Sequence, residues 1–209
     1  MRRREFLRGA VVLPVAMSVR PDALPIKRAS FEEVGDAVLM SLNLPALIRR
    51  YDRDALESID SGFDTSLHFT LKLWQHGTRK LIGTRELLVR IRWDPWKQRY
   101  VVATREDGRW SKRTFSERDA AVAAAVKLDR VRVAAAAELA RGEDGPYYFV
   151  TVLALRNPLD PPADFGGATR PQGRDLEWFG QLVNVLAGER PEAEETVHVR
   201  TNAFYLVSR

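Results

Sequence analysis

The histidines and cysteines of a chain set what metal or thiol chemistry it can perform. His68, His76 and His198 form neither an H-x-x-x-H nor an H-x-H pattern, so their spacing does not pair two imidazoles on one helix or strand face. A three-ligand zinc site would need carboxylates that the sequence does not single out. The chain has no cysteine, which excludes disulfides, thiol catalysis and thiolate metal ligands. We therefore predict no metal site and no cofactor.

Paired carboxylates are the next groups that could act on a substrate. Asp160 and Asp164, and likewise Glu143 and Asp144, stand close together in segments that are expected to be loops. Two such acids could work as a pair in glycoside hydrolysis. Acids in loops more commonly aid solubility or form turns, so the pattern alone assigns no catalytic residue.

Motifs for a nucleophile or a bound phosphate do not occur in the chain. It contains no G-x-S-x-G elbow, no P-loop and no G-x-G-x-x-G after a strand. Ser61, beside Gly62, fits a turn, and Ser111, beside Trp110, fits the end of a strand.

Tryptophans are the strongest candidates for contact with a partner, because indoles stack on sugars and anchor protein interfaces. The chain has five, Trp74, Trp93, Trp96, Trp110 and Trp178. Trp93 and Trp96 flank Asp94-Pro95, a dipeptide that suits the first two positions of a type I turn. Packing in the core or closing a sheet edge is the alternative use. We take Trp93, Trp96 and Trp74 as the candidate partner-binding residues.

The first eighteen residues have the organisation of an export signal. Arg3-Arg4-Glu5-Phe6-Leu7-Arg8 precedes an apolar run from Gly9 to Val19. The segment resembles the twin-arginine motif, with Arg3, Arg4, Phe6 and Leu7 at its defining positions. The apolar run is shorter than a membrane span of about 20 residues. We expect cleavage near Ser18 and a product that is periplasmic or otherwise exported, or membrane-tethered if the signal is retained.

Once this segment is set aside, the charge of the chain no longer suggests nucleic-acid binding. The whole chain has 33 basic and 28 acidic residues, but residues 1–18 hold four arginines and one glutamate. The remainder is therefore close to balanced, at +2. Positive and negative residues alternate, as in the run from Arg49 to Asp54, which is typical of a solvated surface. We predict no nucleic-acid partner.

Alternation of apolar and polar residues predicts several strands that follow one another through tight turns. The clearest covers 66–74, where Leu67, Phe69, Leu71 and Leu73 share one face. The other predicted strands cover 38–44, 87–93, 97–103, 110–114, 147–156 and 196–207. In the last of these, the odd-numbered residues from Val197 to Val207 are expected to share a face.

Three short helices are expected beside these strands. One covers 54–59 and ends at Ser61-Gly62. A second begins near Ser116, and we predict that it breaks near Lys127, where β-branched residues begin to alternate. The third is an amphipathic helix over 176–187, with Leu176, Phe179, Val183 and Leu186 on one stripe.

The predicted fold class is α+β and β-rich, with a mainly antiparallel sheet or sandwich and two or three short helices packed on it. The predicted organisation is a signal over 1–18, a flexible arm over 19–35 and one β-rich domain over 36–209.

Three short motifs in this order are similar to those of a family of small exported bacterial envelope proteins, catalogued as a domain of unknown function. They are 56–62, which ends in Ser-Gly, 92–96 with sequence Arg-Trp-Asp-Pro-Trp, and 145–150, which contains Tyr-Tyr-Phe-Val. The resemblance covers roughly 36–160. It implies an uncharacterised, non-enzymatic envelope domain, some of whose relatives are encoded beside membrane sensor kinases, and it supplies no catalytic residue. The twin-arginine start and the tail from Gly173 depart from the family pattern.

These observations support two hypotheses of function. The first is a non-enzymatic periplasmic binding or accessory protein that recognises another envelope protein through a sheet edge or the tryptophan-bearing hairpin. The alternative is a protein that binds or cleaves envelope glycans, using the tryptophans and the loop acids. The sequence predicts no membrane span after cleavage and leaves the oligomeric state open.

Overall fold

The computed structural model describes residues 20–142, 145–158 and 193–207. All of them belong to one compact unit. The export-signal residues Arg3, Arg4, Phe6 and Leu7, the loop acids and the helix expected over 176–187 lie outside the described residues.

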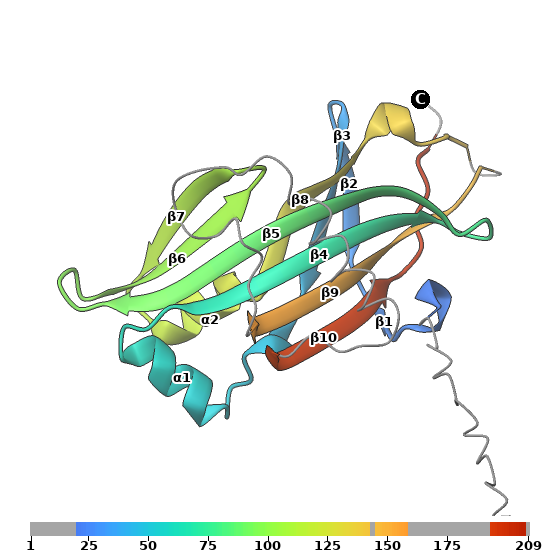
Figure 1. Ribbon diagram of the computed structural model, residues 1–209. Helices are drawn as coiled ribbons and strands as arrows, with labels where there is room; N and C mark the ends of the chain where they lie inside the picture. The colour runs from blue at the N-terminus through green and yellow to red at the C-terminus, as the bar shows by residue number, and fades with distance from the viewer. Residues whose placement is uncertain (1–19, 143–144, 159–192, 208–209) are drawn as a thin grey trace, which may run out of the picture. The chain divides into compact units, whose positions relative to one another are not determined.

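Within the described ranges, ten strands form two sheets (Figure 1). The larger sheet has the order β1-β10-β9-β4-β5-β6-β7 and the smaller has the order β2-β3-β8. The bounds are β1 Ile26–Lys27, β2 Ser30–Val34, β3 Ala37–Asn43, β4 Thr65–Gln75, β5 Lys80–Asp94, β6 Arg99–Glu106, β7 Arg109–Phe115, β8 Lys127–Ala135, β9 Tyr148–Pro158 and β10 Ala193–Thr201. Pairings between these strands are antiparallel except the two-residue pairing of β1 with β10.

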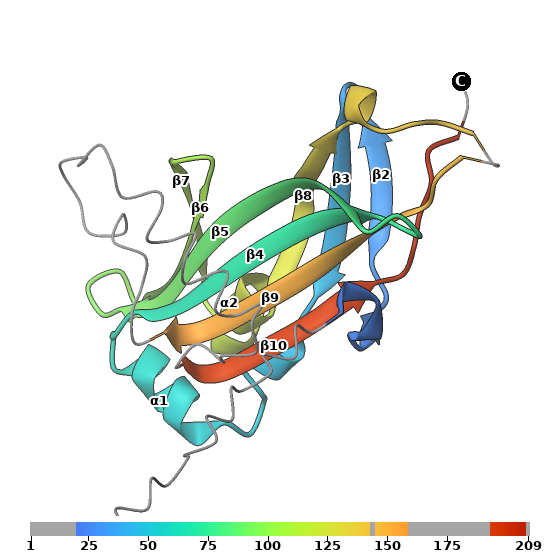
Figure 2. The same cartoon turned by 45° about the vertical axis from the view of Figure 1, so that its right-hand side comes forward.

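The core lies between the two sheets. Leu67, Phe69, Leu71 and Leu73 of β4 are all buried on its inner face, as the alternation of the sequence predicts. The smaller sheet contributes Val38 and Met40 of β3 to the same cluster. Figure 2 shows the smaller sheet behind the larger one. The domain is thus built from two β layers, with their apolar faces against each other.

Two α-helices of the described part of the chain flank the larger sheet, α1 over Arg53–Asp60 and α2 over Arg118–Ala125. Helix α1 begins where the Asp52 carboxylate accepts the Ala55 N–H at 3.2 Å. Helix α2 stops before Lys127, where β8 begins, so the predicted break is confirmed. Three 3₁₀ turns complete the described elements, η1 Pro21–Ala23, η2 Pro45–Leu47 and η3 Ala136–Glu138.

The structure differs from the sequence-based prediction at two places near the termini of the chain. The segment 19–35, predicted as a flexible arm, contains strands β1 and β2, and β2 pairs with β3 over five residues. The last strand ends at Thr201 rather than at Val207. Beyond it, Phe204 and Leu206 are buried while Tyr205 and Val207 are exposed, so the expected common face of the odd residues is wrong after Thr201.

Asn202 lies at the point where the inward-facing positions change from odd to even. Its Oδ1 accepts the Ala29 N–H at 2.8 Å, which ties the end of β10 to the segment between β1 and β2. Phe204 then stacks on Phe31 with ring centroids 3.9 Å apart. A long-range contact therefore sets the inward face of the tail, and the local pattern does not.

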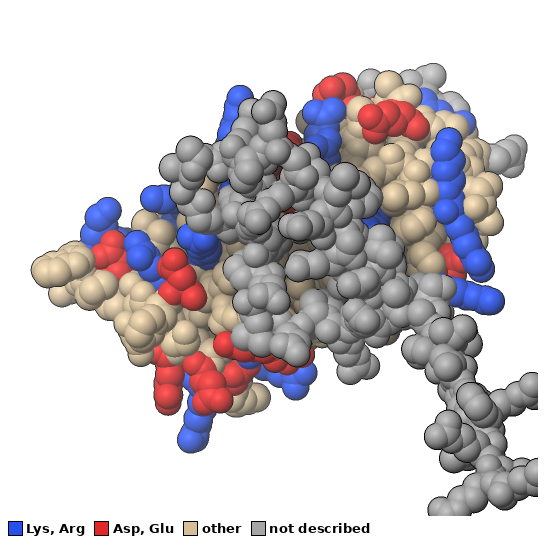
Figure 3. All heavy atoms as spheres, in the orientation of Figure 1, with Lys and Arg blue, Asp and Glu red and all other residues tan. Residues whose placement is uncertain are grey.

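The β-rich, mainly antiparallel α+β class predicted from the sequence is confirmed. Within the described residues, no helix has the length and apolarity that a membrane crossing requires. On the face drawn in Figure 3, basic and acidic side chains are interspersed over the described residues that are in view, in keeping with the mixed charge pattern of the sequence.

Candidate functional site

The turn between β5 and β6 carries two of the three predicted partner-binding residues. Trp93 and Asp94 end β5 and pair with Tyr100 and Arg99 of β6. The Asp94 carboxylate accepts the backbone N–H groups of Trp96, at 3.1 Å, and Lys97, at 3.2 Å. This local bonding fixes the turn, as Asp side chains commonly do. Trp96 lies at the tip and is 94% exposed.

Trp93 has a different environment from Trp96. Its ring packs against that of Tyr100, with centroids 4.7 Å apart, and the side chain is half-buried. The Tyr100 hydroxyl donates to Asp60 Oδ1 at 2.9 Å, and Arg118 donates to Asp60 Oδ2 at 2.7 Å. Burial and the hydrogen bond to Asp60 raise the pKa of Tyr100, so the phenol stays protonated. Helices α1 and α2 therefore both anchor the base of the hairpin.

A further exposed aromatic residue belongs to the same end of the sheet. Phe63 is 70% exposed and precedes β4, whose first residue, Thr65, pairs with Ile91 near the end of β5. Gly62, at φ +83°, lies against the Trp93 carbonyl, because a Cβ at this position would be 3.4 Å from that oxygen. We call Phe63, Trp93 and Trp96 the aromatic end. Phe63 could not be recognised from the sequence, since a single phenylalanine in a loop has no distinctive pattern.

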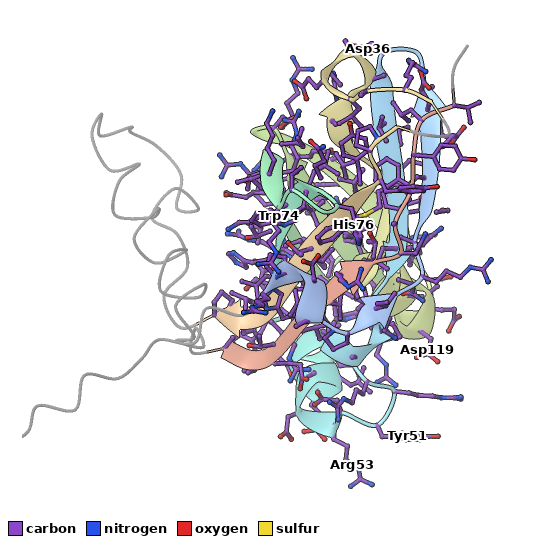
Figure 4. All side chains as sticks on the ribbon, turned by 90° about the vertical axis from the view of Figure 1, so that its right-hand side faces the viewer. Asp36, Tyr51, Arg53, Trp74, His76 and Asp119 are labelled. Carbon is purple, nitrogen blue, oxygen red and sulfur yellow. The ribbon has the colours of Figure 1, made fainter. Side chains whose placement is uncertain are left out.

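Trp74, the third predicted residue, does not join this group. It pairs with Leu81 beside the β4–β5 turn, whereas Trp93 is twelve positions further along β5. At the rise of a strand this separation is roughly 40 Å. The Trp74 indole N–H donates to Thr151 Oγ1 at 2.9 Å. Figure 4 shows Trp74 on the side of the larger sheet that faces away from the smaller sheet. Trp74 therefore lies apart from Trp93 and Trp96, and the three candidate residues belong to two different places on the larger sheet.

Trp110 lies on β7, the last strand of the larger sheet, and is also partly exposed. The Arg90 guanidinium stands over its ring, 5.4 Å from the centroid. Arg109, Lys112 and Arg113 make this strand strongly basic. Positive charge on an edge strand protects a sheet against unwanted strand pairing, and we assign it that role here.

A polar cluster that the sequence analysis did not predict lies on the outer face of the larger sheet, opposite the core. It consists of His68 and Lys72 on β4, Glu86 on β5 and His198 on β10. Burial lowers the pKa of His68 to about 4, with a contribution from the positive charge of Arg90. Burial raises the pKa of Glu86 to about 7, against the opposing effect of Lys72. Perturbed titration of this kind is typical of functional sites and of buried polar networks alike.

The remaining two groups of this cluster are shifted in the same sense as His68. Burial lowers the pKa of Lys72, with Glu86 opposing the effect. Burial and the charge of Lys72 lower the pKa of His198. Both histidines are consequently neutral near pH 7. The alternation of apolar and polar residues within their strands does not predict this burial, because it places both histidines on the outer face of the sheet, which is ordinarily solvated.

Among the residues that the structure describes, the histidines do not form a metal site. No group of three or more His, Cys, Asp or Glu side chains in the described ranges is arranged to hold a metal ion. His76 follows β4 and packs edge-on against Phe149, with centroids 6.2 Å apart. The hydroxyls of Ser61 and Ser111 donate to the backbone carbonyls of Glu57 and Thr104. Ser61 therefore belongs to the end of helix α1 and Ser111 to strand β7, and both have structural roles, as the sequence suggests.

Comparison with known proteins identifies the chain at the level of its family. No curated protein and no solved structure matches it. The model of a family described as a domain of unknown function, DUF4390, matches residues 22–154. The match begins at η1 and runs through both sheets into β9, and so includes β1 and β2. Because it covers more than half of the sequence, the chain belongs to the DUF4390 family of domains of unknown function.

Proposed function

We propose that this domain is a non-enzymatic binding or accessory protein of the bacterial periplasm, and that it recognises another envelope protein through the aromatic end. The observation that carries the proposal is the position of Trp96. It projects from a turn that Asp94 fixes, at the tip of a hairpin that two helices support. An indole 94% exposed in this setting forgoes the stabilisation of its burial.

Exposure together with rigidity supports a binding role. Single exposed apolar residues are common on protein surfaces. Here Phe63 and Trp96 are both exposed at one end of the sheet, and Trp93 lies between the core and that surface. Tryptophan is enriched among the residues that dominate binding energy in interfaces. A preorganised backbone reduces the conformational entropy lost on association.

The charged groups around the aromatic end serve the fold, which favours binding over catalysis at this surface. Asp94 bonds to its own turn, and Asp60 bonds to Tyr100 and Arg118. Asp64 lies 3.9 Å from Arg90 and 3.7 Å from Arg92. The described groups with the largest pKa shifts belong to the outer face of the sheet.

Photocrosslinking in cells tests the proposal at the level of one residue. A benzophenone amino acid replaces Trp96 in one variant, and Thr78, exposed on the β4–β5 turn, in a matched control. We expect one defined adduct with an envelope protein from position 96, competed by the unlabelled wild type and absent from position 78. Equal adducts from both positions, or none from position 96, would contradict the proposal.

Periplasmic location is the second part of the proposal, and the signal-like segment supports it. Cells expressing the wild type and the Arg3→Lys/Arg4→Lys variant are fractionated, and the intact mass of each product is measured. We expect a periplasmic species shortened near Ser18 that disappears in the double variant, because a twin-arginine signal depends on both arginines. A full-length cytoplasmic product from both genes would refute export.

A glycan ligand is the second candidate function, since an exposed indole such as Trp96 can also stack on a sugar ring. Cosedimentation with purified peptidoglycan distinguishes the two. Binding to glycan that Trp96→Ala abolishes would replace the protein-partner proposal. Release of soluble sugar fragments would add a cleaving activity.

A further inference from the structure

Lys72 is the starting point, because it is a buried cation on a sheet face opposite the core. Its side chain is 9% exposed, although its position on β4 is on the outer face of the larger sheet. It forms no hydrogen bond or ion pair with any residue that the structure describes. The charge of Glu86 affects the pKa of Lys72, and the charge of Lys72 affects the pKa of His198. Ammonium groups removed from water are ordinarily paired, so Lys72 lacks a compensating partner among the residues that the structure describes.

Arg200 is a second cation on the same face of the sheet. It forms a row across three neighbouring strands with Lys72 and Thr151. Lys72 pairs with Thr151 of β9, and Thr151 pairs with Arg200 of β10. The Arg200 Nε is buried without a hydrogen-bond partner. Its guanidinium carbon lies 5.6 Å from the centre of the Phe149 ring, which holds the side chain over the sheet. Lys72 and Arg200 therefore start two strand spacings apart, roughly 10 Å, on one face.

The residue between the two cations supplies a third donor. Thr151 is buried, and its Oγ1 accepts the Trp74 indole N–H at 2.9 Å. The indole N–H occupies one lone pair of Oγ1, so the hydroxyl proton of Thr151 is directed to another acceptor. The row therefore offers an ammonium, a hydroxyl and a guanidinium side by side. This combination of donors is suited to carboxylate or phosphate oxygens.

The neighbouring groups leave the row positively charged. His198 is neutral near pH 7, because burial and Lys72 lower its pKa. Glu86 is the nearby counter-charge, but burial raises its pKa to about 7, so it is partly protonated at neutral pH. His68, with a pKa lowered to about 4, adds no charge. An anion bound here would relieve the cost of burying Lys72 and the unpartnered Arg200 Nε.

We propose that Lys72, Thr151 and Arg200 form a binding site for one anionic group, a carboxylate or a phosphate, on the outer face of the larger sheet. The site is separate from the aromatic end and does not depend on the function proposed there. Trp74 orients the central hydroxyl and is a positioning residue. Trp74, which lies apart from the hairpin, thus belongs to a second recognition surface.

Titration followed by ¹H–¹⁵N NMR tests the site with defined probes. Sodium phosphate and sodium acetate are added separately at constant ionic strength, with chloride as the reference anion. The reporters are the Trp74 indole N–H and the Thr151 amide. We expect a saturable shift of both signals with at least one probe. Tighter phosphate binding identifies a phosphate ligand, and tighter acetate binding identifies a carboxylate.

Variants separate a specific site from general charge attraction. Lys72→Met and Arg200→Met should each weaken binding about tenfold or more, the loss expected for one charge-assisted hydrogen bond. Thr151→Val should weaken it while keeping both charges. Lys112→Met removes an exposed cation from β7 and should leave binding unchanged.

Several outcomes would overturn the site. The proposal fails if neither probe shifts the two reporters in a saturable way, or if Lys112→Met weakens binding as much as Lys72→Met does. Arg200→Lys keeps the charge and replaces Arg200→Met in the experiment if the latter does not fold. Retention of binding in Arg200→Lys supports the site. Trp96→Ala should leave the titration unchanged, so a failure here is distinguishable from a failure at the aromatic end.

Discussion

Arg156 of β9 donates a hydrogen bond from its Nη1 to Oδ2 of Asp52, the residue that caps helix α1. Arg156 is 6% exposed and also bonds to the Leu47 carbonyl at 3.0 Å and to Glu194 at 3.1 Å. One guanidinium thereby joins β9, β10, η2 and the start of α1. Because α1 supplies Asp60 to the base of the hairpin, this contact also supports the geometry of the aromatic end.

Replacement of Asp52 should destabilise the domain through two losses. Asp52→Ala removes the cap of α1 and leaves Arg156 with Glu194 as its remaining acidic partner. We expect the free energy of unfolding to fall by about 2–4 kcal/mol, since the pair is partly exposed on the Asp52 side. Urea unfolding measures it. Asp54→Ala, an exposed acid in the same turn, is the control and should change stability by less than about 0.5 kcal/mol.

The contact between Asp52 and Arg156 also predicts how the free energy of unfolding depends on pH. Burial alone would raise the pKa of Asp52, but hydrogen bonds from Arg156 and the Ala55 N–H lower it below 3.8. A depressed carboxyl pKa contributes stability above the unfolded value, and the contribution is lost as the pH falls through the folded value. The stability difference between wild type and Asp52→Asn should therefore shrink below pH 3.8. A difference that stays constant into acid would exclude this linkage.

Glu86 and His68 should give opposite pH dependences over overlapping ranges. The folded pKa of Glu86 is raised from 4.5 to about 7, so its contribution makes stability fall as the pH rises through that range. The folded pKa of His68 is lowered from 6.5 to about 4, so its contribution makes stability rise from about pH 4 to 6.5. In the wild type the two contributions partly cancel.

Single variants should reveal each contribution. Glu86→Gln should show stability that rises with pH between about 4 and 6.5, with His198 acting in the same direction. Relative to the wild type, His68→Asn should show stability that falls more with pH between 4.5 and about 7, because only His198 then opposes Glu86. Urea unfolding at a series of pH values measures both. A profile of Glu86→Gln parallel to that of the wild type would show that Glu86 titrates normally in the folded state.

Local patterns in the sequence predicted most of the strands, whereas contacts between distant strands determine the candidate sites. The alternation through β4 is complete within nine residues, so Leu67, Phe69 and Leu71 could be assigned to the core directly. Lys72 belongs to the same pattern as an outward residue, which suggests exposure. Its burial becomes visible only when β9 and β10 place Thr151 and Arg200 beside it.

The tryptophans show the same limit. The type and spacing of Trp93, Asp94 and Trp96 were sufficient to predict a turn with aromatic residues. Which indole is free depends on Tyr100, Asp60 and Arg118, which come from β6 and the two helices. Trp74 shared their residue type but lies at the opposite end of β5 from Trp93.

The two tryptophans of the hairpin should differ sharply in their effect on stability. Trp93→Ala removes the contact with Tyr100 and should lower the free energy of unfolding by about 1–3 kcal/mol, less than a fully buried tryptophan would cost. Trp96→Ala should change it by less than about 0.5 kcal/mol, because the ring is exposed. Thermal and urea unfolding of both variants measure the difference. A large loss in Trp96→Ala would mean that this ring packs within the domain and would remove the basis of the binding proposal.

Lys72→Met should make the domain more stable, which is unusual for the replacement of a buried residue. The methionine retains most of the apolar stem of the lysine and removes a charge that has no hydrogen-bond partner among the described residues. We expect a gain of about 1 kcal/mol in urea unfolding at neutral pH without added phosphate or carboxylate. Lys112→Met, exposed on β7, should have no comparable effect.

The pH dependence of this gain gives an independent test. Burial lowers the pKa of Lys72 below 10.5, so the folded state releases this proton before the unfolded state does. Wild-type stability should therefore rise relative to Lys72→Met as the pH increases toward 10.5, and the gap between the two should close. An anion that binds should also narrow the gap, because it stabilises the wild type more than the variant, which binds it more weakly. A destabilised Lys72→Met at neutral pH would instead show that the ammonium is already compensated in the folded protein, which would argue against an anion site around Thr151.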